Sequence, residues 1–159
     1  ARSWSVQRLL EEDIFLIASR QTRSTKAPKS LRMSQLIDEP LILPTGPHGL
    51  RSTLNAAFAR ANITPQVTLE IDSLAMLMDA VQSGLGATLQ PWAAVARMNS
   101  PETNLYMARI SDHKVKRVNL LCGLSDGELS PAALAARVVI NDCVSTLVKE
   151  GAWQGVVLD

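Results

Sequence analysis

Short apolar runs alternate with amphipathic stretches through the middle of this 159-residue chain. The apolar runs 41–43, 66–71 and 86–90 have the length of buried or half-buried strands. Between them, 50–61 and 74–81 repeat their apolar residues at the spacing of one helix face. Alternating strands and helices need right-handed crossovers and a mainly parallel sheet. The sequence therefore predicts an α/β domain with helices flanking such a sheet.

Residues that start and stop helices stand at the ends of the amphipathic stretches. Asp72 or Ser73 can cap the second helix, and Ser130 followed by proline opens the longest one, which runs to Lys149. Three residues stand where helices end and suit a C-terminal cap: Asn62, Gly84 and Gly151.

Outside the middle of the chain the predicted elements are shorter. A strand is predicted over 9–18, in which Phe15–Ile17 is too apolar to be exposed. Ser30 can cap a short helix that runs through Ile37. Another helix is predicted from Trp92 to Met98, because proline precedes it. Two further strands are predicted at 104–110 and 115–122.

Composition excludes several classes of protein. Hydrophobic residues make up 47% of the chain and charged residues 19%, which is ordinary for a folded domain and unlike a disordered one. Sixteen basic residues against fifteen acidic ones give a net charge of +1, and aromatic residues are only 4%. This piece therefore has no broad electrostatic or stacking surface for nucleic acid. No apolar run approaches the roughly 20 residues of a membrane span, so no membrane partner is expected.

No pattern for a metal, a cofactor or a nucleophile is present. His48, His113, Cys122 and Cys143 lack ligand spacing, and Cys143 is expected to be a core residue on an apolar helix face. The Gly-Leu-Gly triplet at 84–86 precedes a strand, whereas a dinucleotide fingerprint must follow one. No carboxylate stands near His48 in sequence to orient it for catalysis. We expect no catalytic residue, no metal and no cofactor.

Two loops, 43–49 and 88–91, follow strands at their carboxyl ends, where ligands of such sheets bind, and the segment at the first is a candidate binding site. It runs from Pro44 to Leu50, between a strand and the N-terminus of a helix, where unpaired N–H groups favour an anion. Gly46 and Gly49 would let a ligand approach the backbone, Thr45 offers a hydroxyl, and Arg51 or His48 could add charge. The residues are equally compatible with a plain helix-entry turn.

The order of these motifs over about residues 8–148 resembles the effector-binding domain of LysR-type transcriptional regulators. No single motif is diagnostic, and the most recognisable part runs from Ile71-Asp72-Ser73 through the Gly84–Gly86 turn to Pro91. The other segments that resemble the family are Leu9–Ile17, Leu36–Leu43, Leu50–Phe58 with Pro65, and Ser130-Pro131.

The resemblance implies a fold similar to type 2 periplasmic binding proteins, in which two lobes close on a small effector. By position in the family, the effector-binding residues of this chain would be Leu43, Pro44, Thr45, Gly46 and Thr88. We add His48 because of its place in the same loop. A small anion such as a carboxylate is the expected effector, and its binding would change how an N-terminal winged helix-turn-helix holds promoter DNA.

The resemblance also implies a division of the chain. Residues 1–11 would be a hinge strand from the first lobe, 12–115 the second lobe, and 116–159 a return strand and helix that belong to the first lobe. The chain begins Ala-Arg-Ser-Trp without an initiator methionine, so we expect a piece of a longer, cytoplasmic protein. With much of the first lobe outside this chain, the apolar stripe of helix 131–149 is expected to seek cover by self-association.

Two other functions share the predicted fold. A solute-binding protein of a transport system would carry a signal peptide before this segment. An α/β enzyme would carry its acid–base residues in the part of the protein outside this chain. An upstream helix-turn-helix would instead favour the regulator.

Overall fold

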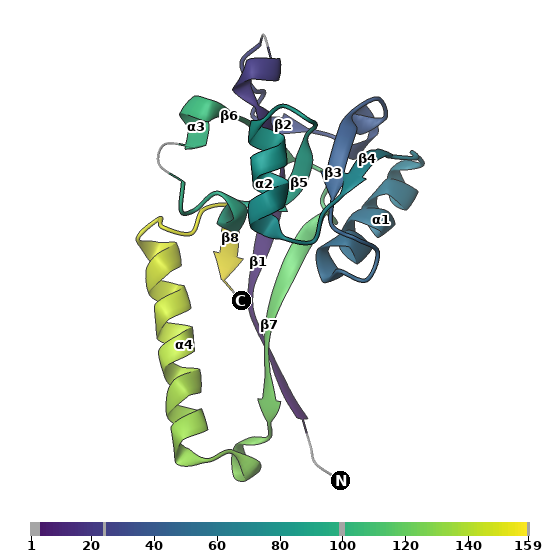
Figure 1. Ribbon diagram of the computed structural model, residues 1–159. Coiled ribbons are helices and arrows are strands. Elements are labelled where there is room, and N and C mark those ends of the chain that lie inside the picture. The colour runs from purple at the N-terminus through teal and green to yellow at the C-terminus, as the bar shows by residue number, and fades with distance from the viewer. Residues whose placement is uncertain (1–3, 24, 99–100, 159) are drawn as a thin grey trace. The chain divides into compact units, whose positions relative to one another are not determined.

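A computed structural model describes residues 4–23, 25–98 and 101–158 of the chain (Figure 1). Strands and helices alternate as the sequence predicts, and the α/β class is confirmed. The strands are β1 (Trp4–Ser19), β2 (Ser30–Leu31), β3 (Pro40–Leu43), β4 (Gln66–Glu70), β5 (Thr88–Pro91), β6 (Leu105–Ile110), β7 (Lys116–Leu124) and β8 (Val156–Leu158). The α-helices are α1 (Gly49–Ala61), α2 (Leu74–Gln82), α3 (Pro101–Asn104) and α4 (Pro131–Lys149). Short 3-10 turns are η1 (Arg20–Thr22), η2 (Met33–Leu36), η3 (Trp92–Ala94) and η4 (Asp126–Glu128).

Contacts divide the chain into two compact units. Unit 2 is Asp13–Arg117, and unit 1 combines Ala1–Glu12 with Val118–Asp159. The chain passes between them twice, within β1 and within β7. The assignment of 12–115 to one lobe and the rest to another stays a prediction.

The sheet of unit 2 has the order β2-β6-β1-β5 and joins the β3–β4 pair through a parallel bridge between Leu41 and Ala87. The β2–β6 and β3–β4 pairs are parallel. β1 is the exception, because it runs antiparallel to both β5 and β6. Its segment from Phe15 to Ile17 therefore lies between two partners. Ile14–Ala18 is apolar on both faces because its alternate side chains pack into apolar clusters on opposite sides of the sheet.

Helices α1 and α2 of unit 2 cover opposite faces of this sheet (Figure 1). Leu50, Leu54 and Phe58 of α1 pack in one apolar cluster with Leu41 and Leu43. The opposite cluster contains Leu77, Met78 and Val81 of α2, packed with Ile42 of β3 and Ile17 of β1. Because β-strand side chains alternate between faces, neighbouring residues of one strand serve the two clusters.

The helix boundaries confirm much of the sequence reading. Ser73 and Ser130 cap α2 and α4 through their side-chain oxygens. Asn62 ends α1 with φ of 54°, and Gly84 and Gly151 also have positive φ. Local side-chain chemistry fixed these ends, so they were readable without tertiary information.

Two predicted helices are wrong. Ser30 lies in β2, because Ser30 and Leu31 pair with β6, and only the short turn η2 follows. The expected helix from Trp92 to Met98 shortens to the three residues of η3. In both places pairing and packing with distant residues override the local signal.

In unit 1, α4 is not covered by the rest of the unit. It has no buried residue, so the prediction that Cys143 lies in a core is wrong, and Cys122 is exposed as well. Within the described residues α4 is the helix long and apolar enough, by length and composition alone, to cross a membrane. Length and composition alone do not establish a membrane span, because a helix that packs against a partner chain satisfies the same criterion.

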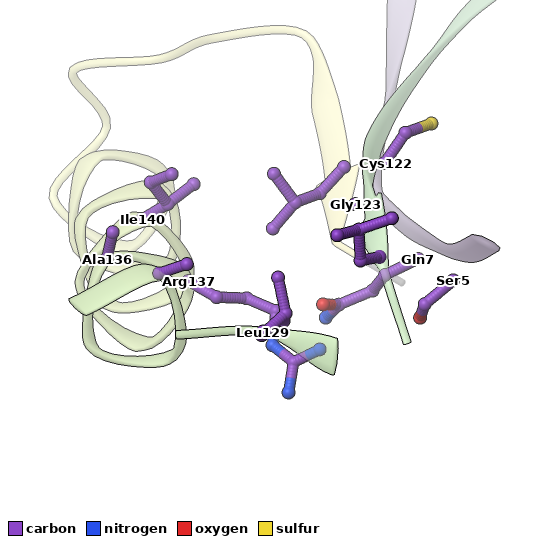
Figure 2. Close-up of a pocket in the computed structure, with 11 residues that line it drawn as sticks. Ser5, Gln7, Cys122, Gly123, Leu129, Ala136, Arg137 and Ile140 are labelled. Atoms are coloured by element: carbon purple, nitrogen blue, oxygen red, sulfur yellow. The ribbon is translucent and has the colours of Figure 1, made fainter. Parts of the chain in front are cut away.

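A cavity of about 190 Å³ opens between α4 and the strands of unit 1 (Figure 2). Leu129, Ala136 and Ile140 face Cys122 and Gly123 of β7 across it. The lining of the cavity is mainly apolar, so the apolar surfaces of the helix and the strands are not fully packed against each other.

Hydrogen bonds hold the C-terminal segment of unit 1. The indole N–H of Trp153 donates to Glu12 Oε1 at 2.9 Å, and the Asn119 amide donates to Glu12 Oε2 at 2.8 Å. β8 pairs with Leu10–Glu12 in the same unit. These contacts satisfy a carboxylate that is almost fully buried.

Candidate functional site

The ends of three strands meet at one edge of unit 2. β3 and β4 are parallel, and the Leu41–Ala87 bridge makes β5 parallel to β3. Their carboxyl ends therefore point the same way, and the Ile71 N–H donates to the Leu43 carbonyl at this edge at 3.0 Å. Ligands of open α/β sheets bind at such an edge.

The loop after β3 is tied to the end of β4 by Thr45 and Asp72. The Thr45 N–H donates to Asp72 Oδ1 at 2.9 Å, and the Thr45 hydroxyl lies 2.9 Å and 3.0 Å from the two carboxylate oxygens. The backbone N–H of Thr45, then its hydroxyl, and then the nearby His48 lower the pKa of Asp72. The hydroxyl predicted to meet an effector is thus bonded to a carboxylate.

His48 and Arg51 are also engaged within the loop. His48 Nδ1 accepts the Leu50 N–H at 3.2 Å, so the imidazole caps α1. Arg51 donates to the Pro44 carbonyl at 2.8 Å and to Glu70 Oε1 at 2.7 Å. These polar groups of the loop are therefore hydrogen-bonded to one another or to Glu70. This arrangement agrees with the interpretation of the loop as a helix-entry turn.

The remaining predicted site residues differ in how far their side chains are exposed to solvent. The side chains of Leu43 and Pro44 are buried, whereas Gly46 is exposed and nothing lies within 4 Å of where its Cβ would stand. Thr88 is fully buried in β5, opposite Ile17. The bridge register sets it level with β3 itself, before the loop begins. The structure thus gathers five of the residues at one loop and places Thr88 beneath the surface on another strand.

Two polar residues of this region are not among the predicted site residues, although Gln90 lies in the predicted loop 88–91. Asp72 was predicted as a possible helix cap, but its carboxylate instead anchors the loop. Gln90 is buried near the end of β5, and its amide forms no hydrogen bond to the described residues. The sequence signal that could have identified Gln90 is its position as a polar residue within a short, mainly apolar strand. No group of three or more His, Cys, Asp or Glu side chains in the described ranges is placed to hold a metal.

Thr45→Val is expected to raise the pKa of Asp72 while leaving it below its ordinary value. The substitution removes the hydroxyl bonds and keeps the backbone N–H, the strongest cause of the lowered pKa. In the parent chain the bonds stabilise the loop above the ordinary pKa of Asp and weaken as pH falls through the lowered value. Carbon-13 NMR titration of the Asp72 carboxyl measures the shift, and Thr53→Val serves as control. An unchanged pKa in Thr45→Val would contradict this anchoring.

Comparison with known proteins decides the family. The family model of the LysR substrate binding domain matches residues 2–142. This chain is a member of that LysR family. The nitrogen assimilation regulatory protein nac of Klebsiella aerogenes is 31% identical over 139 residues, which is 87% of this chain and 44% of that protein. The chain thus spans about half the length of its LysR relatives.

Solved structures show the same LysR fold. The regulatory domain of CcmR from Synechocystis PCC6803, solved in complex with 2-PG, has a TM-score of 0.77 at 19% identity and covers 90% of this chain and 68% of its own. The effector binding domain of QuiR in complex with shikimate has a TM-score of 0.65 at 17% identity, over 95% of this chain and 64% of its own. The predicted resemblance and the fold it implied are confirmed.

Proposed function

We propose that this chain is the effector-sensing part of a transcriptional regulator and that it binds a small anionic metabolite. The family match over residues 2–142 carries the proposal. Relatives named as regulators of transcription and of nitrogen assimilation support it, as do neighbours solved with small molecules. The proposal contains no reaction, because the named relatives regulate transcription.

The proposed mechanism is a shift of population. An effector that binds one arrangement of the domain more tightly than another favours that arrangement. The effector changes promoter affinity by the same factor by which promoter DNA changes effector affinity, and the difference in effector affinity between the two states is the upper limit of that change. Promoter DNA would be held by a winged helix-turn-helix outside these residues, and the protein would act in the cytoplasm. A coding sequence upstream of Ala1 that encodes a signal peptide would instead favour a transport protein.

The proposed effector site is the edge at Thr45, with Leu43, Pro44, Gly46, His48 and Thr88. Open space at Gly46 and the N-terminus of α1 support an anion there. The Thr45–Asp72 bonds put a carboxylate beside it, so an anion must bind on the Gly46 side or displace Thr45.

A small carboxylate is expected to stabilise the regulator that contains this chain against thermal unfolding. At 100 times its dissociation constant, a ligand of the folded state adds about 2.7 kcal/mol to the free energy of unfolding. A thermal-shift screen of organic acids measures this, with Gly46→Val as the variant that should lose the effect. If no acid raises the melting temperature, the assignment of the site to this loop fails.

We further propose self-association through the apolar face of α4. The exposed side chains of Val139, Ile140 and Leu147 support it, since soluble monomers rarely leave a large contiguous apolar patch uncovered.

A further inference from the structure

Two buried polar side chains of β5 have no hydrogen-bond partner among the residues that the structure describes. Thr88 is fully buried, and its Oγ1 is the one wholly enclosed side-chain oxygen or nitrogen without a partner in the described ranges. Gln90 is 6% exposed and its amide is also unpartnered among these residues. Unlike Thr88 Oγ1, the Gln90 amide is not wholly enclosed, because a small part of the residue is exposed to solvent. Buried polar groups are nearly always paired, so an unpaired amide that keeps slight solvent exposure points to a ligand.

The strand register shows which residues accompany Gln90. Gln90 lies opposite Phe15 of β1, and Phe15 lies opposite Arg109 of β6. Side chains directly opposite in antiparallel strands project to the same face. Gln90, Phe15 and Arg109 therefore form one row across the sheet, with Asp13 two residues from Phe15 on that face.

The row carries unbalanced positive charge. Lys116 Nζ is 2.8 Å from Asp13 Oδ1, and the Arg109 guanidinium is 3.7 Å from Asp13 Oδ2. Two cations thus share one carboxylate, which leaves a local charge of +1. A separation of 3.7 Å is too long for a hydrogen bond, so Asp13 leaves the N–H groups of Arg109 available. Arg109 is half-exposed and can reach a ligand from solvent.

We propose that this row binds a small organic acid with two oxygen-bearing groups. Arg109 holds the carboxylate, the Gln90 amide bonds the second group, and the carbon chain lies over Phe15. Gln90 and Arg109 are two strand spacings apart, which places their Cα atoms about 10 Å from each other. Both side chains can extend toward a ligand between them, so the ligand has to span less than this distance. A four-carbon dicarboxylate has the charge and reach for it. The inference rests on the proposed function and places the determinant of effector specificity on β5 and β6, away from the Thr45 loop.

Titration calorimetry with succinate and butyrate tests the row in the 159-residue chain. Arg109→Gln is expected to weaken succinate binding about tenfold or more, because it removes a charged hydrogen-bonding partner. Gln90→Leu should weaken succinate severalfold and leave butyrate unchanged, since butyrate has no second polar group. The matched control is Arg97→Gln, which removes an exposed guanidinium elsewhere in unit 2 and should change neither affinity.

Stability gives an independent readout. Without ligand, Gln90→Leu and Thr88→Val should each raise the melting temperature, because each removes a buried polar group that lacks a partner. A purely structural role for Gln90 would lower it. Unchanged succinate affinity in both Gln90→Leu and Arg109→Gln, equal weakening in Arg97→Gln, or no binding of either acid would overturn the inference.

The two proposals fail separately. If succinate binds and Thr45→Val alone weakens it, the row is wrong and the effector-sensing function stands. If the row binds succinate but the regulator's affinity for its promoter is unchanged by the acid, the site stands and the sensing function fails.

Discussion

The chain is expected to run as a dimer or larger species in light scattering at high concentration. Unit 1 exposes several large apolar side chains, including Val138 and Val139 of α4, which are 59% and 58% exposed. Among the described residues of this unit, Leu10 is the single hydrophobic residue that is buried. Burial of apolar surface stabilises association by roughly 25 cal/mol per Å², before the costs of binding are subtracted.

Charged residues on the α4 face should abolish this association. Ile140→Glu combined with Leu147→Glu places two carboxylates seven residues apart on one face of the helix, which an apolar contact does not tolerate. The matched control is Met76→Glu combined with Leu85→Glu, since these exposed apolar residues belong to unit 2. The first pair should give monomer and the second should not. A parent chain that is monomeric at all concentrations would contradict the proposal.

Gly86→Val is expected to lower the free energy of unfolding by about 3 kcal/mol or more, the upper end for overpacking a core. A Cβ at Gly86 would lie 2.9 Å from the Pro40 carbonyl oxygen and 3.1 Å from Ile42 Cγ1. The same Pro40 oxygen accepts the Ala87 N–H at 2.9 Å, so it cannot move without breaking the contact between β3 and β5. Valine adds two methyl groups to this clash although it favours strands.

Alanine substitutions calibrate that effect. Gly86→Ala should destabilise less than valine, whereas Gly46→Ala should change stability by less than about 0.5 kcal/mol because its Cβ meets nothing within 4 Å. Urea denaturation of the three variants measures the series. Equal stability of Gly46→Ala and Gly86→Ala would show that the approach of β5 to β3 is not tight.

The site was only partly predictable from sequence. Loop 44–50 was identifiable because a strand, glycines and a helix start follow one another along the chain. The bonds from Thr45 to Asp72 span 27 positions, and no local pattern announces them. Gln90 joins Phe15 and Arg109 through pairing across three strands, so its neighbours were unknown until the register was known.

The sequence by itself determined the α/β class, the helix caps at Ser73 and Ser130, the left-handed turn at Asn62 and the family resemblance. These features depend on side-chain chemistry and periodicity within a few residues, which can be recognised in the amino-acid sequence alone. Only the tertiary structure decided that β1 runs antiparallel to its neighbours and that Cys143 lies exposed on an uncovered helix. Burial and strand pairing depend on which distant segments come together. The amphipathic pattern of α4 predicts that its apolar face packs against another surface, but it does not indicate which surface.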